Sequence, residues 1–143
     1  MFYPIALLVF VFDTFVKTFI SGHFYPARSV SLIKGLLNLT YVRNTGVAFG
    51  LFPGKRILLI LISIAVCAIV VYFYTKTKKK DFLLKIAFAI ILGGSLCNMF
   101  DRIFYGYVID YIDFRVFPVF NLSDVAINTG VFLIILDLFL KRK

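Results

Sequence analysis

The stretch ILLILISIAVCAIVVYFYT, residues 57–75, decides the class of fold, and it is followed at once by KTKKKD at 76–81. It is free of charged residues and has close to the ~20 apolar residues that a helix needs to cross a bilayer. The lysine cluster that follows marks the end of the apolar region. The sequence therefore predicts a transmembrane helix that ends in a short basic connection.

Three further apolar stretches of similar length occur at about 1–20, 82–100 and 125–140. Hydrophobic residues make up 62% of the 143-residue chain, well above the roughly half expected in a soluble domain. A soluble domain of this size could not bury so much apolar surface. The sequence therefore predicts an all-α membrane protein, with residues 1–143 forming one domain that contains four transmembrane helices.

Clusters of basic residues indicate the orientation. The connection at 76–81 and the tail at 141–143 are very short and together contain seven Lys and Arg residues. The other two connections also contain seven, but these are spread over nearly sixty residues. By the positive-inside rule, the dense clusters predict that both termini are cytoplasmic. The net charge is +9, but the basic residues are clustered and do not alternate with aromatic residues along one surface, as they do in many nucleic-acid-binding proteins. No nucleic-acid partner is therefore expected.

The two outer connections contain segments typical of β-strands. LLNLTYVR at 36–43 and YVIDYIDFRV at 107–116 are rich in β-branched and aromatic residues with partial alternation. These segments predict a small extracytoplasmic β-sheet. The apolar hexapeptide VAFGLF at 47–52 precedes the helix-breaking pair at 53–54 and predicts a short interfacial helix.

Acidic residues gather at one end of the predicted bundle. All seven acids are Asp, and four of them lie within twenty-four positions: Asp101, Asp110, Asp113 and Asp124. Carboxylates at a membrane boundary indicate function, and two that approach each other can share a proton and activate a water, as in aspartic proteases. Local spacing does not decide which two would meet, and Asp124 could instead cap the fourth helix.

The other reactive side chains favour structural roles. Asp13 and Lys17 are four residues apart in the first stretch, so they share a helix face and predict a buried ion pair. Cys67 and Cys97 lie in apolar runs without the spacing of metal ligands, and His23 has no matched nucleophile. No metal or organic cofactor is expected.

Five segments occur in order along the whole chain: FDTFVK at 12–17, RNTGVAFG at 43–50, GGSLCNMFDR at 93–102, GYVIDYIDF at 106–114 and FNLSD at 120–124. Together they resemble the motifs of the bacterial lipoprotein signal peptidases, also called signal peptidase II, the aspartic peptidases of family A8. Two differences from the usual family motifs are Thr14, where Gln is common, and Ser123 with Val125, where Ala and Ser are common.

This resemblance implies a multi-pass endopeptidase of the bacterial cytoplasmic (inner) membrane that removes the signal peptide from diacylglyceryl-modified prolipoproteins, cutting before the lipidated cysteine. It implies Asp110 and Asp124 as the catalytic pair, near the extracytoplasmic face, and an outer sheet called a β-cradle. Apart from its substrate and membrane lipids, no obligate partner is expected. The resemblance assigns substrate-binding roles to Asn44, Asn98, Arg102 and Asn121, and structural roles to Asp13, Lys17 and Asp101.

Two other classes of membrane protein compete with this interpretation. A small proton- or ion-coupled transporter could use intramembrane Asp residues as relays, and a non-catalytic assembly factor would need no chemistry. Transporters place their acids near the bilayer midplane, often within repeated halves. Here four of seven acids cluster at the outer end and no internal repeat is visible, which favours the peptidase.

Overall fold

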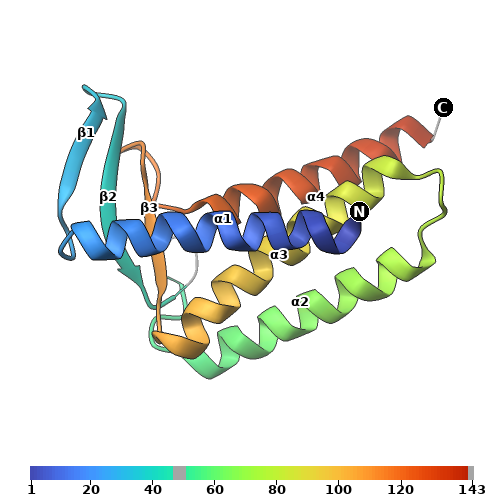
Figure 1. The fold of residues 1–143 in the computed structure, drawn as a ribbon, viewed down its shortest axis with the longest axis horizontal. Coiled ribbons are helices and arrows are strands. Elements are labelled where there is room, and N and C mark those ends of the chain that lie inside the picture. The colour runs from blue at the N-terminus through green and yellow to red at the C-terminus, as the bar shows by residue number, and fades with distance from the viewer. Residues whose placement is uncertain (47–50, 142–143) are drawn as a thin grey trace.

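The structure is a computed structural model and describes residues 1–46 and 51–141 (Figure 1). Each of its four long helices is apolar enough to cross a membrane. In chain order the elements are α1 (Phe2–His23), β1 (Ser29–Ile33), β2 (Leu37–Asn44), α2 (Arg56–Lys76), α3 (Phe82–Phe104), β3 (Val108–Asp113) and α4 (Leu122–Lys141).

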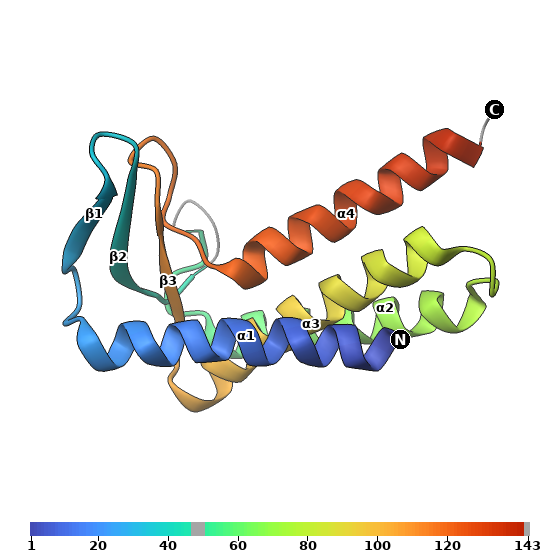
Figure 2. The same ribbon diagram turned by 45° about the horizontal axis from the view of Figure 1, so that its top comes forward.

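Helix α3 is the centre of the bundle, because it packs against α1, α2 and α4 and is the most extensively buried of the helices. Helices α2 and α4 lie apart over most of their length (Figures 1 and 2). Both chain ends and the α2–α3 connection lie at one end of the bundle, and the sheet lies at the other. Helix α3 therefore separates α2 from α4 and contacts both of them as well as α1.

Glycines allow α3 to approach its neighbours closely. A Cβ on Gly94 would lie 2.6 Å from the backbone oxygen of Ser123 in α4, and a Cβ on Gly93 would strike the backbone oxygen of Ala6 in α1. Small residues at such contacts let transmembrane helices pack backbone to backbone. The α3–α4 contact at Gly94 lies one turn from Asn98 and beside the first turn of α4.

The three strands form an antiparallel sheet in the order β1-β2-β3. The β2–β3 register places Val42 opposite Asp110 and Asn44 opposite Val108. Tyr41, Ile109 and Tyr111 are buried in one cluster with Ile20 of α1. The sheet is therefore held against the end of the bundle by the last turns of α1.

The predicted fold class is confirmed: four apolar helices carry a small antiparallel sheet. The two predicted strands correspond to β2 and β3, whereas β1 was not predicted, because all five of its residues are exposed and it has no buried alternation. Of the predicted interfacial helix at 47–52, residues 47–50 lie outside the described part of the chain, and residues 51–55 form turns and irregular structure.

Replacing Gly94 by Ala is expected to lower the free energy of unfolding by about 1–3 kcal/mol, because the new methyl group overpacks the α3–α4 contact. Thermal unfolding of the purified protein in detergent measures the change. Gly22→Ala is the matched control, since nothing lies within 4 Å of its Cβ position in α1. Equal unfolding temperatures for both variants would contradict the close contact.

Candidate active site

Asp110 and Asp124 border one cavity. Asp110 lies on β3 and is 1% exposed, and Asp124 lies in the first turn of α4. The cavity has a volume of about 680 Å³ and extends from these carboxylates along α2, α3 and α4. Asn44, Asn98 and Arg102 also line it. Two carboxylates that are 14 positions apart in the sequence thus face the same space, together with three of the four residues predicted to bind substrate.

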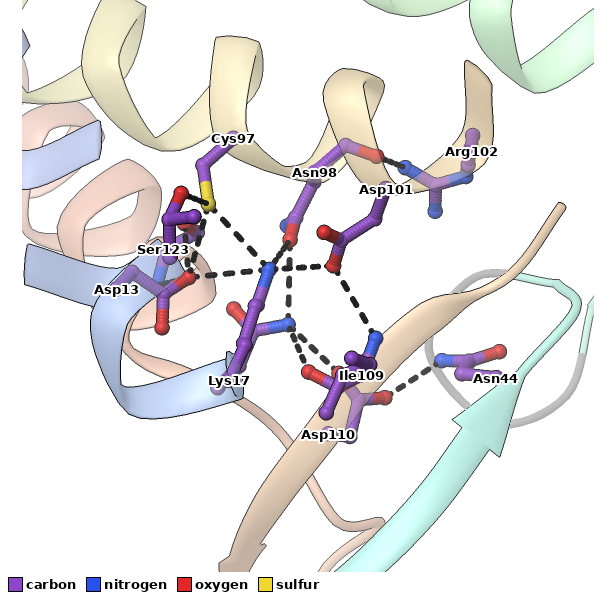
Figure 3. Close-up of polar contacts among 12 residues, drawn as sticks. Asp13, Lys17, Asn44, Cys97, Asn98, Asp101, Arg102, Ile109, Asp110 and Ser123 are labelled. Atoms are coloured by element: carbon purple, nitrogen blue, oxygen red, sulfur yellow. Dashed lines mark hydrogen bonds and ion pairs between the residues drawn. The ribbon is translucent and has the colours of Figure 1, made fainter. Parts of the chain in front are cut away.

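Two asparagine amides connect the carboxylates. Asn121 Nδ2 donates to Asp110 Oδ1 at 2.6 Å and to Asn98 Oδ1 at 3.2 Å, and Asn98 Nδ2 donates to Asp124 Oδ1 at 2.8 Å. Asn44 Nδ2 donates to the other Asp110 oxygen at 2.8 Å (Figure 3). Asn121 is fully buried and does not line the cavity. It lies behind the carboxylates and holds them relative to each other.

The start of α4 fixes Asp124. Asp124 N donates to Asn121 Oδ1 at 2.9 Å, and Asn121 N donates to Asp124 Oδ2 at 3.2 Å. These reciprocal bonds form a capping box with Asn121 as the N-cap residue. The alternative that Asp124 is the N-cap residue is therefore wrong, because the N-cap residue is Asn121, three positions earlier. A carboxylate in this first turn is also favoured by the helix dipole.

The environment of Asp110 favours its protonated form. Burial, and after it the negative charge of Asp124, raises the pKa of Asp110 to about 7. Hydrogen bonds from Asn44 and Asn121 act in the opposite direction, since they stabilise the carboxylate. Around neutral pH Asp110 is therefore partly protonated.

Lys17 is the centre of a buried ion cluster behind the cavity. Its ammonium is 2% exposed and lies 3.1 Å from Asp13 Oδ2, 2.8 Å from Asp101 Oδ2 and 2.8 Å from Asn98 Oδ1 (Figure 3). The predicted Asp13–Lys17 pair is thus present. The bond to Asn98 connects this cluster directly to the amide that holds Asp124.

Three further residues of the cluster were not predicted. Tyr111 OH donates to Asp13 Oδ1 at 2.7 Å, and the Ser123 hydroxyl donates to Asp13 Oδ2. Cys97, expected to be an apolar packing residue, has its Sγ 3.5 Å from Lys17 Nζ and 3.4 Å from Asp13 Oδ2. The polarity of Tyr111 and Ser123 was visible in the sequence, but their partner is 98 and 110 positions away.

The end of α3 supports β3 and the loop after β2. Asp101 Oδ2 accepts a bond from Ile109 N at 3.2 Å, next to Asp110 in the chain. Arg102 donates to the carbonyl oxygens of Asn98 at 3.3 Å and Gly46 at 3.1 Å. Within the described residues, the buried Arg102 Nε has no hydrogen-bond partner.

These features define a class of protein: a four-helix membrane protein in which one buried and one half-buried carboxylate face the same cavity. The family model described as "Signal peptidase (SPase) II" matches residues 5–140 of the chain. The chain therefore belongs to the signal peptidase II family, and the resemblance found in the sequence is confirmed. It is accordingly an aspartic peptidase of a bacterial membrane, and the transporter alternative has no support among its relatives.

Full-length relatives agree with this assignment. The lipoprotein signal peptidase of Halothermothrix orenii is 40% identical over 143 residues, which cover 100% of this chain and 98% of that protein. The lipoprotein signal peptidase of Fusobacterium nucleatum is 44% identical, covering 96% of this chain and 86% of its own.

A solved structure described as a bacterial membrane enzyme is also similar. It is 33% identical, and it superposes with a TM-score of 0.93 over 98% of this chain and 88% of its own. The similarity therefore extends over the sheet and the helices of this chain together.

Replacing Asp13 by Ala is expected to cost about 3–5 kcal/mol of stability, since it removes one of the two carboxylates that compensate buried Lys17. The yield of folded protein should fall more than the turnover of each folded molecule. Thermal unfolding and active-enzyme concentration measure the two effects. Asp113→Ala, at a half-buried carboxylate on the sheet, is the control. Normal stability with lost turnover would contradict a structural role for Asp13.

Proposed function

We propose that the chain cleaves diacylglyceryl-modified prolipoproteins immediately before the lipidated cysteine, with Asp110 and Asp124 as its catalytic pair. One observation carries the proposal: both carboxylates face the same cavity and are joined through Asn98 and Asn121. The raised pKa of Asp110 supports a pair that shares one proton. When two carboxyl groups share one proton, the protonated one can act as the acid and the ionised one as the base.

Peptide hydrolysis by this pair needs one water in the cavity. The ionised carboxylate takes a proton from the water as its oxygen attacks the scissile carbonyl carbon, while the protonated carboxyl donates its proton to the carbonyl oxygen. The tetrahedral intermediate then loses the amine as the C–N bond breaks: one carboxyl donates a proton to the amine nitrogen, while the other carboxylate takes back a proton from a hydroxyl group of the intermediate. The pair ends with one proton, as it began.

The charges around the cavity fit this scheme. Four carboxylates, those of Asp13, Asp101, Asp110 and Asp124, are accompanied by two cations, Lys17 and Arg102. Burying uncompensated charge is costly, so a proton on the catalytic pair brings the site closer to neutrality. We assign structural roles to Asp13, Lys17 and Asp101 because, within the described residues, neither carboxylate of the pair is among their hydrogen-bond or ion-pair partners. Asn98 links them to the pair through its bonds with Lys17 and Asp124.

The orientation follows from charge and from the shape of the bundle. The end that holds both termini also holds Lys76, the lysines of the α2–α3 connection and Lys141 (Figure 1). The positive-inside rule assigns that end to the cytoplasm. The sheet and the catalytic pair are then at the outer face, where a signal peptide emerges from the bilayer.

Substrate would reach the cavity from the side. Helices α2 and α4 both line the cavity and lie apart (Figure 1), so we infer that the substrate enters between them from the bilayer. Ile62, Val66 and Ile127 give this side an apolar lining. A signal-peptide helix and diacylglyceryl chains could remain in lipid there while the scissile bond meets the carboxylates.

Asp110→Asn and Asp124→Asn are each expected to reduce cleavage of a diacylated precursor by about a thousandfold or more, because neither can exchange a proton in acid–base catalysis. Purified enzyme in lipid is incubated with diacylated and unmodified precursor in parallel, and only the diacylated precursor should be cut by wild type. Thermal unfolding checks that the variants remain folded.

Asp113→Asn is the matched control for these variants. Asp113 lies on the same strand as Asp110, but it accepts a hydrogen bond from Thr40 and does not line the cavity. Its replacement should leave turnover near that of wild type. Near-normal turnover by either catalytic variant would falsify the assignment of the pair, and equal cleavage of both precursors would remove the lipid requirement.

Removing the Asn44 amide should move the pH profile. Its hydrogen bond stabilises ionised Asp110 and so lowers the pKa of that carboxyl, which means that Asn44→Ala should raise the pKa. The alkaline decline of kcat/KM, expected near pH 7 in wild type, should shift to higher pH. Initial rates between pH 5.5 and about 9 measure it. Asn38→Ala, on the same strand opposite Asp113, should not shift the profile. A shift to lower pH would contradict this role.

A further inference from the structure

Two polar residues of α4 are unexplained by the catalytic site. Asn128 and Thr129 are exposed, although α4 is an apolar helix long enough to cross a membrane, and both line the cavity. Within residues 1–46 and 51–141, the structure gives their side chains no hydrogen-bond partner. A polar side chain without a partner is unfavourable in hydrocarbon. Their presence therefore indicates a ligand that supplies the missing hydrogen bonds.

The other polar side chains of α4 do have partners. Ser123 donates to Asp13, Asp124 accepts from Asn98, and Asp137 lies 2.8 Å from Lys141. The free pair at 128–129 is thus distinct within this helix. Across the cavity it faces a lining that includes Ser63 of α2 and Ser95 of α3. Ser95 is buried and has no partner among the described residues either.

We propose that Asn128 and Thr129 bind the backbone of the signal peptide where its helix ends, on the amino-terminal side of the scissile bond. The inference rests on the proposed function. A peptide bond must leave its helix to be cut, and the freed N–H and C=O groups need partners at membrane depth. Asn is suited to this, because its side chain both accepts and donates.

The spacing along α4 indicates which part of the substrate is bound. Asn128 is one helical turn from Asp124 toward the other end of the bundle, about 6 Å at 1.5 Å per residue. An extended peptide covers about 6 to 7 Å in two residues. With the proposed orientation, the signal peptide runs from Asn128 toward Asp124. Asn128 is therefore placed to bind the second or third residue before the cut.

Backbone recognition is tested by a double-mutant cycle with a modified substrate. Diacylated precursor peptides are prepared with an ester in place of the peptide bond at each of the three positions before the cut, which removes one N–H at a time. We expect the ester at the second or third position to lower kcat/KM of wild type about fivefold, the factor for one hydrogen bond. Asn128→Leu should lose about fivefold with the all-amide peptide and almost nothing more with the ester.

Matched variants separate this role from a general effect on the helix. Thr129→Val should lower kcat/KM, whereas Thr75→Val should not, because Thr75 is exposed outside the cavity and bonds only to the Tyr72 carbonyl. Asn128→Ala should behave as Asn128→Leu does, which covers the case that Leu disturbs folding. All these side chains are exposed, so unfolding temperatures should match wild type.

The inference would be overturned if Asn128→Leu and the ester each lowered kcat/KM and the two factors multiplied when they were combined. Asn128 would then not bind the N–H that the ester removes. Unchanged kcat/KM in both Asn128 variants would overturn it as well. In either case wild type still cleaves the all-amide diacylated peptide. Failure of wild type to cleave that peptide would instead contradict the proposed function, so the two failures are distinguishable.

Discussion

The ammonium group of Lys17 is buried where α1, α3 and β3 meet, and a buried cation in a membrane protein has to be compensated by its neighbours. Asp13 comes from the same helix and Asp101 from α3, so the ion cluster joins the two helices at a fixed register. Asp101 also accepts a bond from Ile109 N, which fixes β3 to the same point. The position of Asp110 on β3 thus depends on the charge of Lys17, although Asp110 does not contact Lys17.

Lys17 also sets the direction of the amides between the carboxylates. An ammonium can only donate, so Asn98 must turn its oxygen toward Lys17 and its nitrogen toward Asp124. Asn121 is oriented in the same way, because its oxygen accepts from Asp124 N and its nitrogen then faces Asp110. The donors around both carboxylates are therefore arranged before any substrate binds, which is the electrostatic preorganisation that enzymes require.

The sequence predicts those parts of the structure that depend on local patterns. Continuous apolar stretches indicated the four helices, β-branched residues indicated β2 and β3, and the spacing of Asp13 and Lys17 indicated their pair. Exposed β1 has no such pattern. The contacts that complete the site join distant positions, such as Lys17 with Asp101 and Tyr111 with Asp13. No spacing encodes these pairs, which is why the residues alone left several candidate acids open and only the family motifs selected two.

The position of the site at one end of the bundle follows from the properties of the bilayer. A three-stranded sheet has open edges whose backbone groups need water, so β3 cannot lie in hydrocarbon. Asp110 is consequently restricted to the boundary, and Asp124 meets it there only because α4 begins at Leu122. A hydrolase acting on a membrane substrate needs both water and access from lipid. In the function we propose, the sheet end supplies the first and the side of the cavity between α2 and α4 supplies the second.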